Sequence, residues 1–120
     1  MKINLKILKE KDACKPGLDW FQKNYGDDDV DVDEVLAELE KQKVNYQSWL
    51  MTTFKLTAIC KGWYESGEIK YEGNFKNGKR GGFYREWYEN GQIIYEGNYG
   101  NGKAEGICKG WYKDGQIEYE

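Results

Sequence analysis

The sequence contains no histidine, a single proline and three cysteines among its 120 residues. Without histidine the chain cannot form a Ser-His or Cys-His nucleophilic pair, bind a metal through imidazole, or use the side chain that most often shuttles protons near neutral pH. Carboxylates, lysines and tyrosines are present, but no spacing brings them together as a catalytic set. We therefore expect no enzymatic activity and no bound cofactor.

The chain also lacks long apolar runs and an excess of basic residues. No segment approaches the roughly 20 apolar residues that cross a bilayer. The first residues, "MKINLKILKEKD", have lysines between the apolar positions and no cleavage site of a secretory signal. The 18 Lys+Arg residues are outnumbered by 21 Asp+Glu residues, giving a net charge of −3. Direct nucleic-acid or membrane binding is therefore not expected.

The cysteines, Cys14, Cys60 and Cys108, are odd in number and form no CxxC pattern. This usage is typical of reduced thiols, and we expect a cytoplasmic protein.

Glycine and aromatic residues are abundant, and they follow a 24-residue repeat. Trp63, Trp87 and Trp111 are spaced by 24 residues, and columns of Tyr, Gly and Glu keep the same spacing. Each copy carries two turn signals: Ser66-Gly67, Asn90-Gly91 and Asp114-Gly115 in the first, Asn77-Gly78 and Asn101-Gly102 in the second. Asn-Gly and Asp-Gly favour type I′ hairpin turns. The repeat therefore predicts an antiparallel meander of about six strands.

A two-residue loop at the first turn fixes a register for each hairpin. The predicted pairs in the first copy are Tyr64–Ile69, Gly62–Tyr71, Cys60–Gly73, Trp63–Lys70 and Lys61–Glu72. The later copies give Tyr88–Ile93, Arg85–Glu96, Tyr112–Ile117 and Lys109–Glu120. One face would carry a Tyr/Ile ladder, and the other a Trp ladder edged by pairs of opposite charge. Cys60 and Cys108 would lie roughly 19 Å apart, too far for a disulfide.

The first half follows a helical pattern instead. Apolar residues recur at helical spacing in residues 12–26, 31–43 and 45–54. We predict three short helices that pack on each other and on the start of the sheet, because none is long enough to be stable alone. The fold class is α+β, with a helical module at 1–55 and the repeat sheet at 56–120.

Two segments, "GWYESGEIKYEGNFKNGKRGG" and "EWYENGQIIYEGNYGNGKAEG", carry Trp/Tyr before the first turn, Tyr-Glu-Gly between the turns, and Asn-Gly-Lys in the second turn. Over about residues 60–120 this pattern resembles MORN-type repeats, in particular the bacterial YwqK-type antitoxins. The resemblance implies a β-meander that binds or scaffolds proteins, without enzymatic activity and with no fixed partner. The N-terminal half is only similar to small bacterial and phage proteins of unassigned role.

An acidic run, "DDDVDVDE", places six carboxylates in eight residues: Asp27, Asp28, Asp29, Asp31, Asp33 and Glu34. A calcium loop starting at Asp29 would need glycine at its sixth position, where Glu34 stands, so no metal site is predicted. Two interpretations remain open. The acids can belong to a solvated loop that favours the N-terminus of the next helix. Alternatively, they imitate a phosphate backbone and occupy a basic groove on another protein.

The sheet offers two further candidate surfaces. If the Tyr/Ile face is buried, the tryptophans and their neighbouring cations form an exposed groove for a peptide or protein segment; if the helices cover the Trp face, they do not. This set is Trp63, Trp87, Trp111, Lys61, Arg85 and Lys109. The third copy stops before its second turn, so we expect an unpaired edge strand of Gln116, Ile117, Glu118, Tyr119 and Glu120. It would pair with a second copy as a homodimer or with a partner strand, unless its glutamates protect it.

These features predict a non-enzymatic protein that binds and neutralises a bacterial effector. The expected partner is a nuclease or toxin with a basic groove. An antitoxin-like protein and a phage-encoded inhibitor of a nuclease defence system, such as an anti-CRISPR, fit equally well. The alternative is a structural scaffold or self-assembling interaction module without inhibitory activity.

Overall fold

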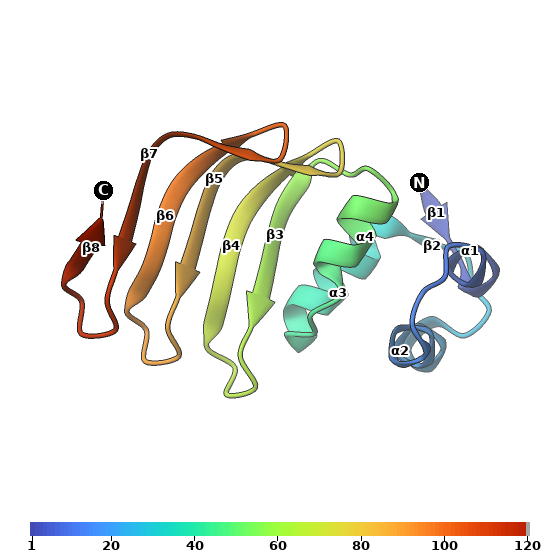
Figure 1. Ribbon diagram of the computed structural model, residues 1–120. Helices are drawn as coiled ribbons and strands as arrows, with labels where there is room; N and C mark the ends of the chain where they lie inside the picture. The colour runs from blue at the N-terminus through green and yellow to red at the C-terminus, as the bar shows by residue number, and fades with distance from the viewer. Residues whose placement is uncertain (120) are drawn as a thin grey trace. The chain divides into compact units, whose positions relative to one another are not determined.

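The computed structural model describes residues 1–119, and the chain divides into two compact units, Met1–Gln42 and Lys43–Glu120. The first unit is mainly helical, and the second contains a six-stranded antiparallel sheet (Figure 1). The α+β class and the repeat sheet are therefore as predicted. The helix expected at residues 45–54 lies in the second unit with the sheet, whereas the sequence pattern grouped it with the helical module.

The first unit contains three helices and a short two-stranded sheet. The helices are α1 (Leu5–Glu10), α2 (Lys15–Tyr25) and α3 (Val32–Gln42), and β1 (Lys2–Ile3) pairs antiparallel with β2 (Val30–Asp31). The side chain of Asn4 accepts a hydrogen bond from the Ile7 N–H at 2.9 Å, which caps α1. Gly26, with a φ of 61°, ends α2. Neither α1 nor the small sheet was predicted, because both are too short to produce a periodic pattern.

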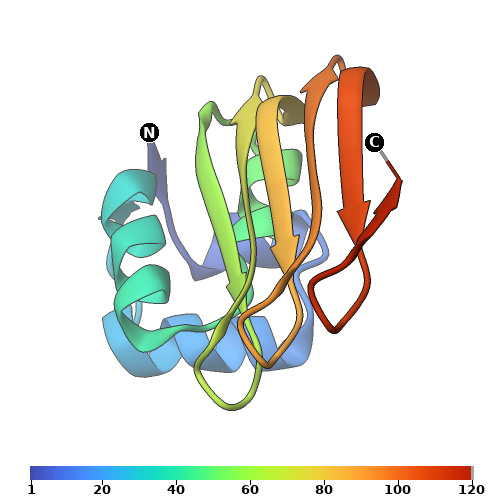
Figure 2. The same ribbon diagram turned by 90° about the vertical axis from the view of Figure 1, so that its left-hand side faces the viewer.

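The second unit begins with α4 (Gln47–Thr53), which packs against the first strand of the sheet. The six strands pair in chain order, and Figure 2 shows them side by side. Their bounds are β3 (Ala58–Trp63), β4 (Ile69–Lys76), β5 (Lys79–Trp87), β6 (Ile93–Gly100), β7 (Lys103–Trp111) and β8 (Ile117–Tyr119).

Side chains just before and within α4 bond to the outer edge of β3. The Asn45 amide accepts from the Trp63 N–H at 2.8 Å and donates to the Trp63 carbonyl at 2.9 Å. The Gln47 side chain accepts from the Lys61 N–H at 2.9 Å. These bonds occupy backbone groups that an incoming strand would need, so this edge of the sheet is blocked.

The two turns of each repeat differ in type. Asn77 and Gly78 both have positive φ, 53° and 81°, as do Asn101 and Gly102, which confirms type I′ geometry at the second turn. At the first turn only the glycine has positive φ, 90° at Gly67, so the predicted two-residue loop is wrong.

The first turn is instead a longer loop closed by a hydrogen bond from the Gly67 N–H to the Tyr64 carbonyl. The side chain before each glycine accepts from the N–H two residues later, as when Asn90 binds the Gln92 N–H at 2.9 Å. Asp114 makes the same bond at 3.0 Å. This local bond holds the residue in an ordinary turn conformation and leaves only the glycine left-handed.

The longer loop changes the register next to it. The predicted pairs Gly62–Tyr71, Cys60–Gly73, Lys61–Glu72 and Arg85–Glu96 are confirmed. The pairs that adjoin the loop are wrong: Tyr64–Ile69, Trp63–Lys70, Tyr88–Ile93 and Tyr112–Ile117. A one-residue shift places each tryptophan opposite an isoleucine, in the pairs Trp63–Ile69, Trp87–Ile93 and Trp111–Ile117. The predicted pair Lys109–Glu120 includes Glu120, which lies outside the described residues.

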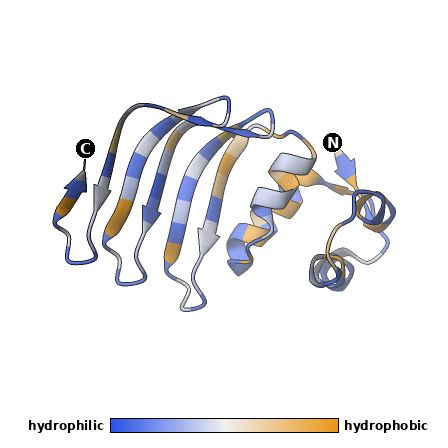
Figure 3. Ribbon diagram, viewed as in Figure 1, coloured by the Kyte–Doolittle hydropathy of each residue, from blue (hydrophilic) through white to orange (hydrophobic). Residues whose placement is uncertain are grey.

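Strongly hydrophobic residues are sparse along the sheet. In Figure 3 the hydrophobic colour on β4, β6 and β8 is concentrated at the end of each strand that follows the first turn of its repeat. Ile69, Ile93 and Ile117 begin these three strands. Away from these isoleucines, the sheet is packed by Cys60, Phe75 and contacts between tyrosine and glycine.

Candidate functional site

Tyrosine rings cover glycines of the neighbouring strand. The Tyr71 ring lies over Gly62, its cross-strand partner, so closely that a Cβ at Gly62 would overlap it. A Cβ at Gly73 would lie 2.8 Å from Cδ2 of Tyr84, which is paired with Gly73. Because glycine has no side chain, the ring can shield the backbone hydrogen bonds of the sheet. The tyrosines of the predicted Tyr/Ile ladder thus lie along one face, whereas the isoleucines are the cross-strand partners of the tryptophans.

The tyrosines form one cluster centred on Tyr84. Its ring centroid lies 6.4 Å from that of Tyr71, 6.0 Å from that of Tyr95 and 5.6 Å from that of Tyr99. The Arg80 guanidinium stacks on the Tyr84 ring, with Cζ 3.9 Å from the centroid. These are edge-on and tilted arrangements typical of packed aromatic rings.

Four groups in and beside the cluster have a raised pKa, which keeps them in their neutral forms: Tyr71, Tyr84, Tyr95 and Cys60. Burial raises the pKa of Tyr84 to about 12, and its hydrogen bond to Glu86 at 2.6 Å adds to this effect. Burial also raises the pKa of Tyr71 and of the Cys60 thiol. The hydrogen bond from Tyr95 to Cys108, 3.1 Å long, is the main cause of the raised pKa of Tyr95. At neutral pH these groups can donate hydrogen bonds, but they are poor nucleophiles and bases.

The predicted tryptophan set is not uniformly exposed. Trp63, beside α4, is only 8 % exposed, whereas Trp87 and Trp111 are half-buried. Lys61 lies 3.9 Å from Glu72, and Arg85 lies 3.2 Å from Glu96.

On β7, Lys109 is the cross-strand partner of the same Glu96. Lys61 and Arg85 are therefore paired with glutamates, Lys109 stands opposite one in the register, and Trp87 and Trp111 are more open than Trp63.

Tyrosine hydroxyls link successive repeats at the first turn of each repeat. Tyr64 donates to the Trp87 carbonyl at 2.6 Å, and Tyr88 donates to the Trp111 carbonyl at 3.1 Å. Tyr112 occupies the equivalent position in the third copy and is 54 % exposed. The sequence shows these tyrosines as a column, but the bond between repeats depends on the stacking of hairpins.

The acidic run is largely exposed and partly held in place within the first unit. Asp27, Asp28, Asp29, Asp33 and Glu34 are exposed, and Asp31 is half-buried. Asp29 accepts a hydrogen bond from the Asn4 side chain at 2.7 Å, and Asp31 lies 3.7 Å from the Met1 amino group. Asp33 and Glu34 fall in the first turn of α3, where acids complement the helix dipole. The middle of the run is thus a strand, β2, rather than a simple loop.

The predicted edge strand is shorter than expected. Strand β8 covers Ile117–Tyr119, and Gln116 belongs to the preceding turn, where its carbonyl accepts from the Tyr112 N–H at 2.7 Å. Ile117 is 49 % exposed, and Glu118 is exposed. Tyr119 pairs with Gly110 of β7, while Glu120 lies outside the described residues. Among residues 1–119, no strand pairs with the other side of β8.

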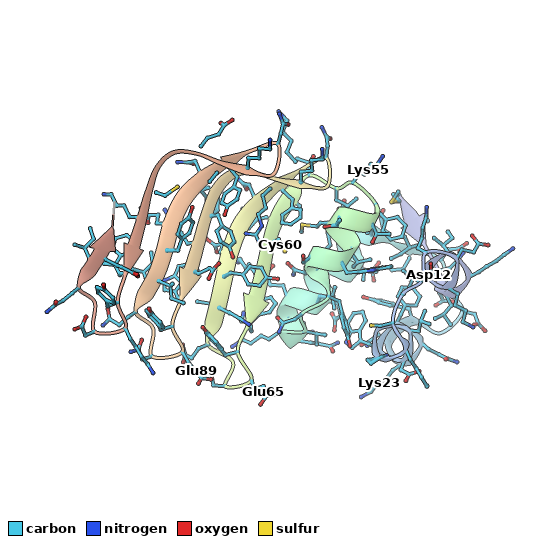
Figure 4. The ribbon with its side chains drawn as sticks, in the orientation of Figure 1. Asp12, Lys23, Lys55, Cys60, Glu65 and Glu89 are labelled. Atoms are coloured by element: carbon cyan, nitrogen blue, oxygen red, sulfur yellow. The ribbon has the colours of Figure 1, made fainter. Side chains whose placement is uncertain are left out.

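A basic hollow of about 820 Å³ lies at the end of the sheet that carries the type I′ turns. Its charged lining consists of Lys55, Lys76, Lys79, Arg80 and Glu105. Tyr99, two asparagines of the turns and three glycines complete it. Figure 4 shows Lys55 at this end of the sheet, whereas Glu65 and Glu89 lie at the opposite end. The sequence pattern did not predict this site. The available signal was the cluster "KNGKRGG", which is more basic than the matching "GNGKAEG".

No group of three or more side chains suited to hold a metal ion occurs among the described residues. Within the same part of the chain, no helix has the length and apolar character needed to cross a membrane.

In the comparison with known families, the MORN repeat variant matches residues 56–77, 81–101 and 104–120. The three segments correspond to the three copies of the 24-residue repeat. No curated protein and no solved structure matches the chain.

Proposed function

This chain belongs to the MORN repeat variant family, whose repeats indicate a protein-interaction module, and we propose that it is a non-enzymatic inhibitor that binds and neutralises a bacterial effector. The effector is a nuclease or toxin with a basic groove. The inhibitor is either an antitoxin of the YwqK type or a phage-encoded protein directed against a nuclease defence system.

The acidic run from Asp27 to Glu34 is the observation that carries this proposal. Five of its six carboxylates are exposed, and the positions of Asp29 and Asp31 are restrained by contacts with Asn4 and the Met1 amino group. Carboxylates held at fixed positions can replace the phosphates that a basic groove normally binds. Restraint also lowers the conformational entropy lost on binding.

The repeat sheet supplies a second contact surface in this proposal. Trp87 and Trp111 are half-buried and lie beside Arg85 and Lys109. Aromatic and arginine side chains are enriched where protein interfaces gain most of their binding energy. A segment of the target that lies across these strands would add a second set of contacts to those made by the acidic run.

The proposal is tested by capturing the partner and measuring inhibition. Tagged protein is incubated with an extract of the organism that encodes it, and a protein that co-elutes in stoichiometric amount is identified by mass spectrometry. Activity of that nuclease or toxin is then titrated with wild-type protein and with the triple variant D27N/D28N/D29N. We expect the triple variant to require at least about tenfold more protein for half-inhibition, which is about 1.4 kcal/mol of binding energy.

The matched control removes the same number of charges elsewhere. Glu65, Glu68 and Glu89 are exposed acids of the second unit, and the variant E65Q/E68Q/E89Q should inhibit like wild type. Equal inhibition by both triple variants would refute the phosphate-mimic mechanism.

The second candidate function is a structural scaffold that self-assembles through β8. It is favoured by the difference between the edges of the sheet, since β3 is blocked by Asn45 and Gln47 while β8 has a partner on one side only among residues 1–119. A scaffold should form assemblies that grow with protein concentration, measurable by light scattering after size-exclusion chromatography. An inhibitor should give a complex of fixed size with its target.

A further inference from the structure

The basic hollow at the type I′ turns is assembled by contacts between the α4–β3 connection and the two hairpins with type I′ turns, β4–β5 and β6–β7. The Gly78 N–H donates to the Leu56 carbonyl at 3.0 Å, which brings Lys55 against the first type I′ turn. The Gly102 N–H donates to the Arg80 carbonyl at 2.9 Å and joins the second type I′ turn to the first. These backbone bonds place side chains from three segments around one space of about 820 Å³.

The cations of this hollow are not needed to form the turns. The second copy forms the same turn, with φ values of 52° and 83° at Asn101 and Gly102 against 53° and 81° in the first. Yet it has Gly100, Ala104 and Glu105 where the first copy has Lys76, Arg80 and Gly81. Lys79 and Lys103 are the only cations that the two turns share. Formation of the hairpin therefore does not account for the extra positive charge.

The four cations of the hollow outnumber its one carboxylate, Glu105, which lies over Gly100. Within the described residues, none of the four basic side chains makes an ion pair with a carboxylate: Lys55, Lys76, Lys79 and Arg80. Nη1 of Arg80 is buried and has no hydrogen-bond partner among residues 1–119. A buried donor without a partner costs roughly 1–3 kcal/mol, so the Arg80 side chain would gain from a movement that lets Nη1 meet an acceptor.

Arg80 is also held in a defined orientation. Its guanidinium stacks on Tyr84 at 3.9 Å and lies 5.7 Å from the centroid of the Tyr99 ring. Stacking fixes the plane of the guanidinium, and hydrogen bonds can then form only in that plane. This geometry favours a planar carboxylate, which can accept two parallel hydrogen bonds from one guanidinium.

We propose that this hollow binds an acidic segment of a partner protein through the carboxylates of its Asp or Glu side chains. The inference rests on the protein-binding part of the proposed function and assigns to the sheet a site of opposite charge to the Asp27–Glu34 run. The space is large enough for several side chains. Nucleic acid is a poorer fit, because the chain has a net charge of −3.

The test measures binding of a fluorescein-labelled hexaglutamate peptide to the full chain by fluorescence anisotropy. Labelled hexaserine and hexalysine peptides report non-specific binding. We expect hexaglutamate alone to bind, and its affinity to fall as salt is raised from about 50 to about 300 mM.

Paired variants then locate the site. In K76Q/K79Q two cations of the hollow are removed, and the affinity for hexaglutamate should fall about tenfold. The control K103Q/K113Q removes two exposed lysines that do not line the hollow, and its affinity should change less than about twofold. Equal losses in both variants would overturn the proposal in favour of diffuse electrostatic attraction.

Two further measurements distinguish carboxylate binding by the stacked arginine from phosphate binding and from attraction by charge alone. R80K keeps the charge but loses the planar guanidinium, so weaker binding supports the stacked-arginine geometry and unchanged binding contradicts it. Inorganic pyrophosphate that displaces the peptide at concentrations well below those of free glutamate would reassign the site to phosphate. The variant D27N/D28N/D29N should bind hexaglutamate normally, so loss of effector inhibition and loss of peptide binding can be told apart.

Discussion

At the scale of single residues, the sheet is held together by tyrosine rings and the glycines that make room for them. Tyr71 covers Gly62 and Tyr84 covers Gly73, each across one strand pair. Large apolar side chains are rare at these positions, so packing depends on a few close contacts. Small changes at the glycines should therefore have large effects.

Gly62→Ala is expected to lower the free energy of unfolding by about 1–3 kcal/mol, because the added methyl group overlaps the Tyr71 ring. Urea unfolding followed by circular dichroism measures the change. Gly17→Ala in α2 is the control, since its Cβ would have only one neighbour within 4 Å, Sγ of Cys14 at 3.4 Å. There the helix propensity of alanine should leave the protein as stable or up to about 1 kcal/mol more stable. Equal destabilisation by both changes would contradict the proposed packing.

The buried tyrosines also predict how stability responds to alkaline pH. The pKa of Tyr84 is raised from 10.0 to about 12, so the folded state holds this proton more tightly than the unfolded chain. The stabilising contribution is complete below pH 10 and is lost as the pH rises from 10 to 12. The free energy of unfolding should fall in that range by up to about 1.4 kcal/mol per pH unit for each such tyrosine.

Unfolding in urea at several pH values between about 8 and 11.5, for wild type and Tyr84→Phe, tests this response. The variant cannot ionise at this position, so its stability should fall less steeply above pH 10. If the free energy of unfolding fell equally steeply with pH in both proteins, the pKa of Tyr84 would not be raised in the folded state.

At the scale of elements, the two type I′ turns have the same backbone but different surroundings. Gly78 packs against the end of α4 and the residues that follow, where a Cβ would lie 2.8 Å from Cα of Lys55 and 3.2 Å from the Met51 carbonyl oxygen. Gly102 has the same backbone conformation, and nothing lies within 4 Å of its Cβ position. The first turn is therefore part of the core of the second unit, and the second is not.

Alanine at these two positions should separate backbone strain from packing. Gly102→Ala is expected to cost about 1–2 kcal/mol, because alanine is strained at a φ of 83°. Gly78→Ala should cost about 1–3 kcal/mol more through the clash with Lys55 and Met51. Urea unfolding of both variants gives their free energies of unfolding, and the difference between the two losses is the packing contribution. Equal losses would mean that the first turn is not packed as described.

At the scale of the whole molecule, the chain consists of two compact units, and α4 belongs with the sheet. Asn45 and Gln47 bond to the backbone of β3, and α4 packs along the same strand. The sheet should therefore need residues that precede the repeat in order to block its first edge.

Two fragments distinguish the boundary after Gln42, seen in the structure, from the boundary after residue 55 that the sequence pattern predicted. Residues 43–120 are expected to give a cooperative unfolding transition and to stay monodisperse at low concentration. Residues 56–120 lack α4 and expose the edge of β3, so they should be less stable and should associate. Light scattering and circular dichroism report both properties. If the shorter fragment were equally stable and monodisperse, α4 would not protect the edge.

The repeat and its consequences could be predicted from the sequence because they depend on local rules. A 24-residue spacing and Asn-Gly turns specify a meander of hairpins in chain order, and the confirmed pairs Cys60–Gly73 and Arg85–Glu96 lie away from the first turn. The pairs beside that turn were wrong, since the side chains of Ser66, Asn90 and Asp114 accept hydrogen bonds from the backbone N–H two residues later and favour a longer loop. Turn length depends on such side-chain bonds as well as on the dipeptide.

The sequence by itself determined the family, the α+β class, the turn positions and the acidic run, because each is written in neighbouring residues or in a fixed repeat. Tertiary structure alone decided which edge of the sheet is blocked, how buried each tryptophan is and that Lys55 joins the basic cluster of the first type I′ turn. Lys55 and Arg80 are 25 positions apart, and they line one hollow only because Gly78 and Gly102 bond to the segments that carry them. Contacts of that kind depend on how successive hairpins stack, and no local pattern encodes them.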